Sequence, residues 1–448
     1  RHREAVGGLE PQRPAEKHLV ALTRHLALVA REGEAATVVA LGHGHDDVAE
    51  RGETNAQDPL EMRRRDNGMW SQQSPQAFQV FPLAPHTETD VFLAGKLTAM
   101  VAPGGGETQM EGTAEGLCGL GIRARMWRPW EEPLGKVRCL HLFGSAAEHL
   151  PLVEAARRAG LPVVLSTIAW FDWRAYWRQP GGLLERAKSV TGYFARSAFP
   201  QLPSWRRRLY QAADLLLPNS NAEAAQLMRY FQVPVEKIHV VPNGADPRFA
   251  EADPQPFLRL LAQQAAGAST KAAGSAPGAG RFVLCMGRIE PRKNQLGLIR
   301  AMQGTGVPIV LVGDAVPGHQ RYWQACCDEA DGSVYFFPRI DHDDPLLGSA
   351  YAACGCLALT GWYETPGLAA IEAAMTGTPL VLPREGSADE YFGSDAVYVA
   401  CDDLPGIRCA VLQALQRPRD PAIARRIRDH FTCTAAAQAT LEAYRRVW

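Results

Sequence analysis

The 448-residue chain lacks several features that point to particular classes of protein. It has no run of 18 apolar residues, so no segment is predicted to span a membrane. Its 47 Lys and Arg nearly balance its 48 Asp and Glu, and this lack of basic excess argues against a nucleic-acid-binding protein. The ten cysteines include no C-x-x-C pair, so we expect reduced thiols in a cytoplasmic protein. No G-x-G-x-x-G follows a strand-like run, which argues against an oxidoreductase with a dinucleotide site.

Strand-like and helix-like segments alternate along the chain, and this pattern is typical of α/β proteins. The helices include 107–120, 150–159 and 221–231. One set of expected strands comprises 97–101, 122–126, 137–143, 162–168, 214–217 and 239–241. A second set comprises 282–286, 308–312, 334–337, 356–360, 379–382 and 397–400. The sequence predicts two Rossmann-like doubly wound parallel sheets that face each other across a cleft.

The expected domain order places residues 91–252 in a first domain and 281–448 in a second. Residues 253–280 are expected to be a flexible linker, because 265–280 are rich in Ala, Gly and Ser. Residues 1–90 are an N-terminal extension that we expect to be partly disordered, and a start at Arg1 is expected of a fragment or of an upstream-extended reading. Residues 42–47, GHGHDD, are of metal-ligand types, but polar turns of this kind are common and no metal is predicted.

The segment 362–383, WYETPGLAAIEAAMTGTPLVLP, carries two glutamates eight residues apart. Glu364 is expected in a loop and Glu372 within the helix that follows it. Gly367 has no Cβ, so an anionic group can approach the N–H groups of the first helical turn. This arrangement suits a diphosphate at the helix N-terminus, with the two carboxylates accepting sugar hydroxyls. The alternative is an ordinary strand–loop–helix–strand unit in which both glutamates are solvated.

A second motif lies upstream in RFVLCMGRIEPRKNQLGLIRAM, residues 281–302. A buried strand is expected to end at a turn around Gly287, and Arg288 and Lys293 follow in the connecting loop, where parallel α/β sheets place their ligands. A guanidinium fork and a mobile ammonium suit a leaving diphosphate. Cations in loops are usually only solvated, so the motif gains its meaning together with the two glutamates.

Several motifs in sequence order resemble retaining glycosyltransferases of family 4, which have the GT-B fold. They are PGGGETQ (103–109), NSNAEAAQLMRYFQVPVEKIHVVPNGAD (219–246), GRIEPRKN (287–294), LVGDAVPG (311–318) and YETPGLAAIEAAMTGTPLV (363–381). The resemblance extends from about residue 93 to Trp448. It implies hexosyl transfer from a nucleotide-sugar donor to an acceptor hydroxyl with retained anomeric configuration, without a cofactor or a metal. It also implies that the first domain holds the acceptor and that the last helix crosses back onto that domain.

The resemblance implies a role for each matching residue. Arg288 and Lys293 would neutralise the leaving diphosphate, Glu364 would hold the transferred sugar and Glu372 the donor ribose. The donor phosphate would lie among backbone groups, namely Gly104, Gly105, Gly287, Gly367 and Leu368. The expected products are polysaccharides, glycolipids or other glycoconjugates, and the acceptor is a sugar or a lipid-linked sugar.

Other positions leave alternatives open. Ala169 lies near the place where many members of the family have a donor-binding His. It is the one feature that favours a second hypothesis, a non-catalytic scaffold that kept the fold and binds nucleotide sugars. The intact Arg288, Lys293, Glu364 and Glu372 oppose that hypothesis. His141 is either a satisfied, half-buried residue or part of the acceptor site. The aromatic and basic segments 170–177 and 205–210 predict either a packed helix with a solvated basic face, or a surface for an acceptor sugar or for the inner face of a membrane.

Overall fold

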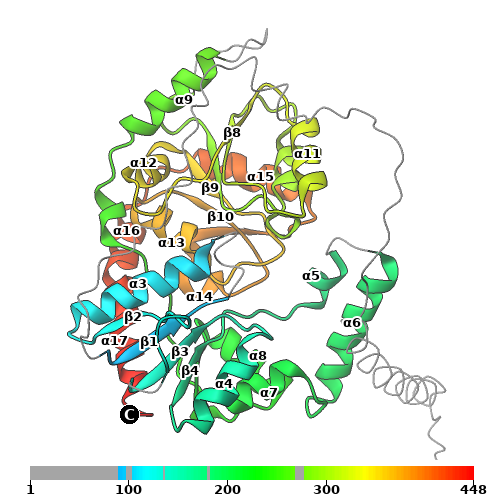
Figure 1. Cartoon of the computed structure of the whole chain (residues 1–448). Coiled ribbons are helices and arrows are strands. Elements are labelled where there is room, and N and C mark those ends of the chain that lie inside the picture. Colours follow the sequence, from blue (N-terminus) through cyan, green and yellow to red (C-terminus); the bar gives the residue numbers. More distant parts are fainter. Residues whose placement is uncertain (1–88, 97–102, 135–136, 179–181, 268–276) are drawn as a thin grey trace, which may run out of the picture. The chain divides into compact units, whose positions relative to one another are not determined.

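The structure, a computed structural model, describes residues 89–96, 103–134, 137–178, 182–267 and 277–448 (Figure 1). The expected strand 97–101, the GHGHDD segment and almost all of the expected extension 1–90 lie outside the described residues. Within the described ranges the elements form two parallel sheets with helices against them, so the predicted α/β class with two Rossmann-like sheets is confirmed. None of the helices in these ranges is both long and apolar enough to cross a lipid bilayer.

The first sheet has the strand order β2-β1-β3-β4-β5, and every neighbouring pair is parallel. Its strands are β1 (Val91–Ala94), β2 (Ala124–Met126), β3 (Cys139–Phe143), β4 (Val163–Ser166) and β5 (Leu215–Leu217). Most residues of these short runs are apolar and buried, as expected where helices cover both faces of a parallel sheet, and Arg125, His141 and Ser166 are polar members. β1 lies between β2 and β3, with Val91 level with Ala124 and Cys139.

One strand of this sheet was not predicted, and one expected strand does not form. The strand that the structure describes near the start of the domain is β1, which begins at Val91 and had not been predicted. Residues 239–241 form no strand. Instead Ile238 makes an isolated bridge to Leu216, and the His239 N–H donates to the Leu216 carbonyl at 3.0 Å. With one bridge, this segment ends the sheet without extending it.

Helices α3 (Gly105–Gly119), α4 (His149–Arg158), α5 (Trp173–Arg178), α6 (Leu183–Ala198), α7 (Trp205–Ala212) and α8 (Asn221–Phe231) complete the first domain. α7 and α8 each begin after a serine, Ser204 and Ser220, whose hydroxyl accepts from a backbone N–H in the first turn. One part of the core lies between α4, α7, α8 and the sheet. α6 is different, because none of its 16 residues is buried.

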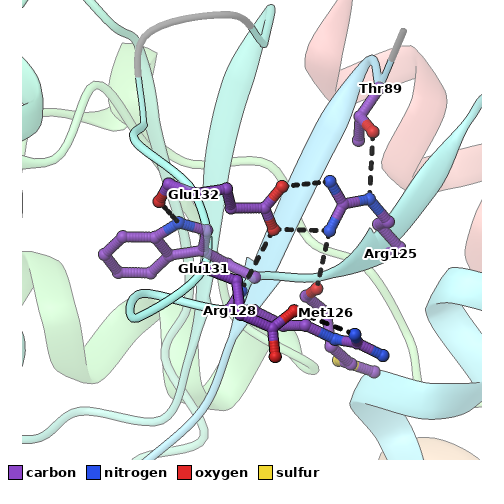
Figure 2. Close-up of polar contacts among 7 residues, drawn as sticks. Thr89, Arg125, Met126, Arg128, Glu131 and Glu132 are labelled. Atoms are coloured by element: carbon purple, nitrogen blue, oxygen red, sulfur yellow. Dashed lines mark hydrogen bonds and ion pairs between the residues drawn. The ribbon is translucent and has the colours of Figure 1, made fainter. Parts of the chain in front are cut away.

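A partly buried ion pair fixes the chain where it leaves β2 (Figure 2). Both guanidinium ends of Arg125 donate to the Glu132 carboxylate, one of them at 2.5 Å, and the backbone N–H of Arg128 donates to the same carboxylate at 3.3 Å. The Arg125 contact holds the pKa of Glu132 below its usual value. Arg125 also donates to the Thr89 hydroxyl at 3.0 Å, which ties the turn after β2 to the start of β1.

The second sheet has the order β11-β10-β9-β6-β7-β8, again with parallel neighbours. Its strands are β6 (Val283–Met286), β7 (Ile309–Val312), β8 (Val334–Phe337), β9 (Cys356–Ala358), β10 (Leu380–Pro383) and β11 (Ala396–Val399). All six lie within the predicted segments or differ from them by a residue. The helices are α10 (Gln295–Met302), α11 (Gln320–Glu329), α12 (Pro345–Ala353), α13 (Leu368–Met375), α14 (Ala388–Phe392), α15 (Leu404–Leu415) and α16 (Pro421–His430).

Two further helices connect the domains differently from a simple linker. The range 253–280 had been expected to be flexible, but it contains the helix α9 (Gln255–Gly267). Phe257 and Leu261 of α9 are fully buried in the core of the second domain, so this half of the range is structural. At the end of the chain, α17 (Cys433–Tyr444) packs against α3 of the first domain (Figure 1). Its Tyr444 is buried against β1 and β3 residues.

Candidate active site

The loop after β6 carries Arg288 and Lys293 and is fixed by contacts with neighbouring segments. Gly287 has a φ of 133°, and Gly313 approaches so closely that a Cβ on it would stand 2.1 Å from the Gly287 carbonyl oxygen. The Gln295 amide donates to the Arg288 carbonyl at 2.9 Å. Asn294 is left-handed at φ 53°, and its amide donates to the carbonyls of Thr360 and Cys401 at 3.0 and 2.8 Å. The loop therefore presents its cations from a fixed backbone.

Lys293 and Glu364 form an ion pair that is largely withdrawn from water. The Lys293 Nζ lies 2.5 Å from Glu364 Oε1, and the two side chains are 17% and 5% exposed. Burial lowers the pKa of Lys293, and the Glu364 charge opposes that shift. The pair joins the two motifs that the sequence suggested should act together, since 71 residues separate them along the chain.

The Glu364 backbone is fixed by a close approach of Gly386. A Cβ at Gly386, which has a φ of 125°, would lie 1.9 Å from the Glu364 carbonyl oxygen, so only glycine fits there. The Glu364 carboxylate in turn lies beside Gly367, whose φ is 91° and which precedes the first residue of α13. A Cβ on Gly367 would be 3.3 Å from Glu364 Oε2. The carboxylate thus stands next to N–H groups of the first helical turn, which have no partner within a helix.

The glycine-rich loop of the first domain reaches both motifs. A Cβ at Gly104 would stand 3.3 Å from the Arg288 guanidinium, and one at Gly105 would stand 3.6 Å from the Leu368 side chain. Gly104 is also the N-terminal cap of α3, where its N–H donates to the Glu107 carboxylate at 2.7 Å. The structure therefore brings together Gly104, Gly105, Gly287, Arg288, Lys293, Glu364, Gly367 and Leu368.

Glu372 belongs to a different set of contacts. It is 4% exposed, and Tyr351 donates to its Oε2 at 2.6 Å while His342 lies 3.3 Å from its Oε1. Burial acts to lower the pKa of His342, but the hydrogen bond to Glu372 and the charge of that carboxylate together outweigh burial, and the pKa is raised. Sequence reasoning missed both partners, because no local motif links Glu372 to residues 21 and 30 positions upstream.

The alternatives for His141 and the aromatic segments can now be resolved in part. His141 is fully buried on β3 between Tyr444 Oη (2.7 Å) and Ser166 Oγ (2.9 Å), and burial lowers its pKa to about 3. It is a satisfied core residue, so the acceptor-site interpretation was wrong. Tyr210 is also fully buried.

In the ranges that the structure describes, no three His, Cys, Asp or Glu side chains gather where they could hold a metal ion.

Part of the aromatic region is exposed and forms what we call the α5–α6 surface. It consists of large apolar side chains on these two helices: Trp173, Trp177, Leu183, Leu184 and Phe194, which are 37–83% exposed. The same two helices carry the cations Arg174, Arg186 and Lys188, and Glu185 is an acidic residue beside them. Apolar and positive groups therefore share one exposed pair of helices.

Comparisons with known proteins agree with this geometry. Residues 119–249 match the model of Glycosyltransferase Family 4, and residues 269–406 match that of Glycosyl transferases group 1. The chain is 25% identical over 246 residues to the O-antigen chain mannosyltransferase B of Escherichia coli. This match covers 52% of the present chain and 61% of the relative. It is 25% identical over 268 residues to the D-inositol 3-phosphate glycosyltransferase of Kineococcus radiotolerans, with 54% and 59% covered. The matches thus span about 60% of the length of these relatives.

Solved structures show the same fold. Sucrose-phosphate synthase from Thermosynechococcus elongatus superposes with a TM-score of 0.60 at 16% identity, over 80% of this chain and 98% of that one. Anabaena HepE in complex with UDP gives 0.54 at 18% identity, over 79% and 99%. The two sheets and the order of the matched domains define a GT-B protein of the glycosyltransferase class. Because the two family models together cover more than half of the sequence in the family's order, the chain belongs to glycosyltransferase family 4.

Proposed function

We propose that this protein is a retaining glycosyltransferase that moves a hexosyl group from a nucleotide-sugar donor to an acceptor hydroxyl. One observation carries the proposal: the buried Lys293–Glu364 pair stands beside the first turn of α13. The glycine-rich loop approaches the same place, since Gly104 lies next to the Arg288 guanidinium and Gly105 lies next to Leu368 in that turn. Cations and backbone donors thus converge where a diphosphate leaving group would develop charge. Electrostatic stabilisation of this kind is commonly the largest part of catalysis.

Each residue has a role in this proposal. Lys293 and Arg288 neutralise the leaving diphosphate, which also accepts from N–H groups at the start of α13. Glu364, next to that turn, accepts from hydroxyls of the transferred sugar. Glu372 accepts from the ribose hydroxyls after one of its present partners yields. Because the cations are side chains, the proposed reaction needs no metal, and transfer on one face depends mainly on positioning.

The relatives support transfer but leave the acceptor open. Their names describe mannosyl transfer to an O-antigen chain and glycosyl transfer to D-inositol 3-phosphate, two chemically different acceptors. A sugar or a lipid-linked sugar therefore remains the proposed acceptor class. The α5–α6 surface favours the lipid-linked form at the inner face of a membrane, since exposed Leu and Trp beside cations suit an anionic bilayer.

A donor screen with variants of the two glutamates tests the proposal. UDP-, GDP- and ADP-sugars are offered with and without excess chelator, and nucleotide release is measured. With the accepted donor, Glu372→Ala should weaken binding of the bare nucleotide diphosphate at least tenfold in calorimetry. Glu364→Ala should not weaken that affinity, because Lys293 remains for the diphosphate, but should slow sugar transfer at least tenfold. Glu251→Ala, at an exposed carboxylate, serves as the control and should change neither quantity.

The same experiment distinguishes the enzyme from the scaffold. A wild type that binds donor but never releases nucleotide with any acceptor would establish the non-catalytic alternative. Equal losses of nucleotide affinity in both glutamate variants would refute the division of roles. Activity that disappears with chelator and returns with Mg²⁺ or Mn²⁺ would overturn metal independence.

Vesicle sedimentation tests the membrane contact separately. The protein should sediment with phosphatidylglycerol-containing vesicles more than with pure phosphatidylcholine vesicles. Glu in place of both Leu183 and Leu184 should abolish the difference, because it removes apolar area and adds negative charge. Trp130→Glu is the matched control, since Trp130 is a 95% exposed apolar residue outside the α5–α6 surface. Equal sedimentation of all three proteins would contradict the membrane contact.

A further inference from the structure

Glu223 in the first turn of α8 is a fully buried carboxylate whose contacts are all neutral donors. Its Oε1 accepts from the Thr167 hydroxyl at 2.5 Å and from the Ala169 N–H at 2.6 Å. Its Oε2 accepts from the Asn219 N–H at 2.9 Å. The positive end of the α8 dipole supports the charge from behind. Burial nevertheless dominates and raises the pKa of Glu223 to about 7.

The two contacts to Oε1 hold a strained turn. Ile168, between Thr167 and Ala169, has a φ of 44°, a conformation that costs a β-branched residue energy. The turn persists because both flanking residues are bonded to Glu223, and because Ser145 donates to the Thr167 carbonyl at 2.7 Å. The strain has a consequence: it directs Ile168 to the glycine-rich loop, where its Cδ1 lies 3.6 Å from the position of a Cβ on Gly106.

The contact to Oε2 connects Glu223 with the loop that carries Glu364. Asn219, whose N–H is bonded to Glu223, donates from its amide to the Thr365 carbonyl at 3.2 Å. Thr365 follows Glu364 directly. Tyr391 of the second domain donates to the Asn219 carbonyl at 2.6 Å, which keeps the residue in place. One carboxylate therefore connects the Ile168 turn, the glycine-rich loop and the Glu364 loop.

We propose that Glu223, as a carboxylate, is a positioning residue that sets the Ile168 turn and the Thr365 contact for sugar transfer. The proposal rests on the proposed function, and Glu223 acts without touching the donor. Its protonation would place a hydrogen where the carboxylate meets only donors, so at least one of the three bonds must weaken. In the part of the chain that the structure describes, Tyr210 from α7 and Tyr391 from α14 interact electrostatically with Glu223. Burial raises the pKa of both phenols, so they stay neutral across the range in which Glu223 titrates.

Three variants test this, with transfer from the accepted donor measured from pH 5.5 to 9. The wild-type kcat should fall as the pH falls through about 7. Glu223→Gln should lower kcat at least tenfold, keep the donor KM within twofold and lack that acid limb. Thr167→Val removes a donor that stabilises the carboxylate, so its limb should move to higher pH. Gln226→Leu is the matched control: Gln226 lies on the same helix and bonds Phe171 in the same loop, and its removal should not move the limb.

A readout without turnover separates failure of this inference from failure of the proposed function. A carboxyl group with a raised pKa in the folded state stabilises the fold below the unfolded value of 4.5, and that contribution is lost as the pH rises towards 7. The melting temperature of wild type relative to Glu223→Gln should therefore fall between pH 4.5 and 7. An unchanged acid limb in Glu223→Gln, or a flat melting difference, would overturn the inference, even in a protein that transfers no sugar.

Discussion

The Lys293–Glu364 pair is buried enough that neither partner can be removed without consequences for the other. Lys293→Ala should cost on the order of 3 kcal/mol in the barrier, or more than a hundredfold in turnover, because it removes a donor to developing phosphate charge. It should also lower the free energy of unfolding by about 3 kcal/mol, since Glu364 is left buried without its cation. Denaturant unfolding and product assays measure the two losses.

The double variant with Lys293→Met and Glu364→Gln separates these effects. It removes both charges, so stability should recover towards the wild-type value while activity stays lost.

Arg288→Ala offers the complementary case, because the Arg288 side chain is 36% exposed. Its loss should reduce turnover with little change in stability. Wild-type turnover in a folded Arg288 or Lys293 variant would contradict the roles proposed for these cations.

His342 gives a pH-dependent contribution to stability through Glu372. Its raised pKa in the folded state means that the contribution is fully present below the unfolded value of 6.5 and is lost as the pH rises through the folded value. Wild type should therefore exceed His342→Gln in unfolding free energy at pH 6 by up to about 1 kcal/mol, and by less at pH 8.5. Denaturant titrations at both pH values provide the measurement. A difference that grows with pH would refute the assigned pairing.

Local motifs predicted the residues that meet around Lys293 and Glu364, but not the residues that hold them in place. Gly367, Arg288 and Lys293 stand in recognisable loops after strands, where position in the sheet indicates a ligand site. The partners of Glu372 come from another loop and helix, and only the fold brings them close. Glu223 did carry a signal, since Ser220 and Glu223 have the spacing of a capping box. That signal indicates a helix start and does not reveal that the carboxylate reaches Thr167.

At the level of elements, a glycine at the contact between α3 and α17 allows the two helices to approach closely. A Cβ at Gly116 would stand 2.6 Å from the Ala437 Cβ and 3.1 Å from the Cys433 carbonyl oxygen. Gly116→Ala should therefore destabilise the protein by about 1–3 kcal/mol, although alanine is the better helix former. Gly192→Ala in α6 is the control, because a Cβ there meets open space and should add about 0.5–1 kcal/mol. Equal effects at both glycines would contradict the close approach.

Elements of the second sheet could be predicted because their strands are continuous apolar runs between clear turns. The first sheet was harder. β1 is only four residues long, and the apolar segment 97–101 beside it has a similar pattern. The helix α9 was missed because its neighbouring 268–280 run is rich in Ala, Gly and Ser, which obscured the buried face that begins at Phe257. Burial against a distant helix, α12, decides its conformation.

At the scale of the whole molecule, polar contacts join the first domain to the second near the loop that carries Glu364. Glu390 accepts from the N–H groups of Asn221 and Ala222 at 2.8 and 2.6 Å and thereby caps α8 from the other domain. Arg178 of α5 pairs with Asp402. Together with the Asn219–Thr365 bond, these contacts set how the first domain meets the Glu364 loop. In the proposed reaction, transfer from a donor on the second domain to an acceptor on the first would depend on that relation.

The start of β1 decides where the chain can be shortened. A chain beginning at Thr89 keeps the bond from Arg125 to the Thr89 hydroxyl and the Asp90–Arg123 pair, which lowers the pKa of Asp90. It should therefore unfold in one transition at nearly the wild-type temperature and bind nucleotide as tightly. A chain beginning at 97 is the matched control. It loses β1 from between β2 and β3, so it should be insoluble or melt far lower. If the chain from Thr89 also fails to fold or bind nucleotide, residues before 89 are part of the first domain.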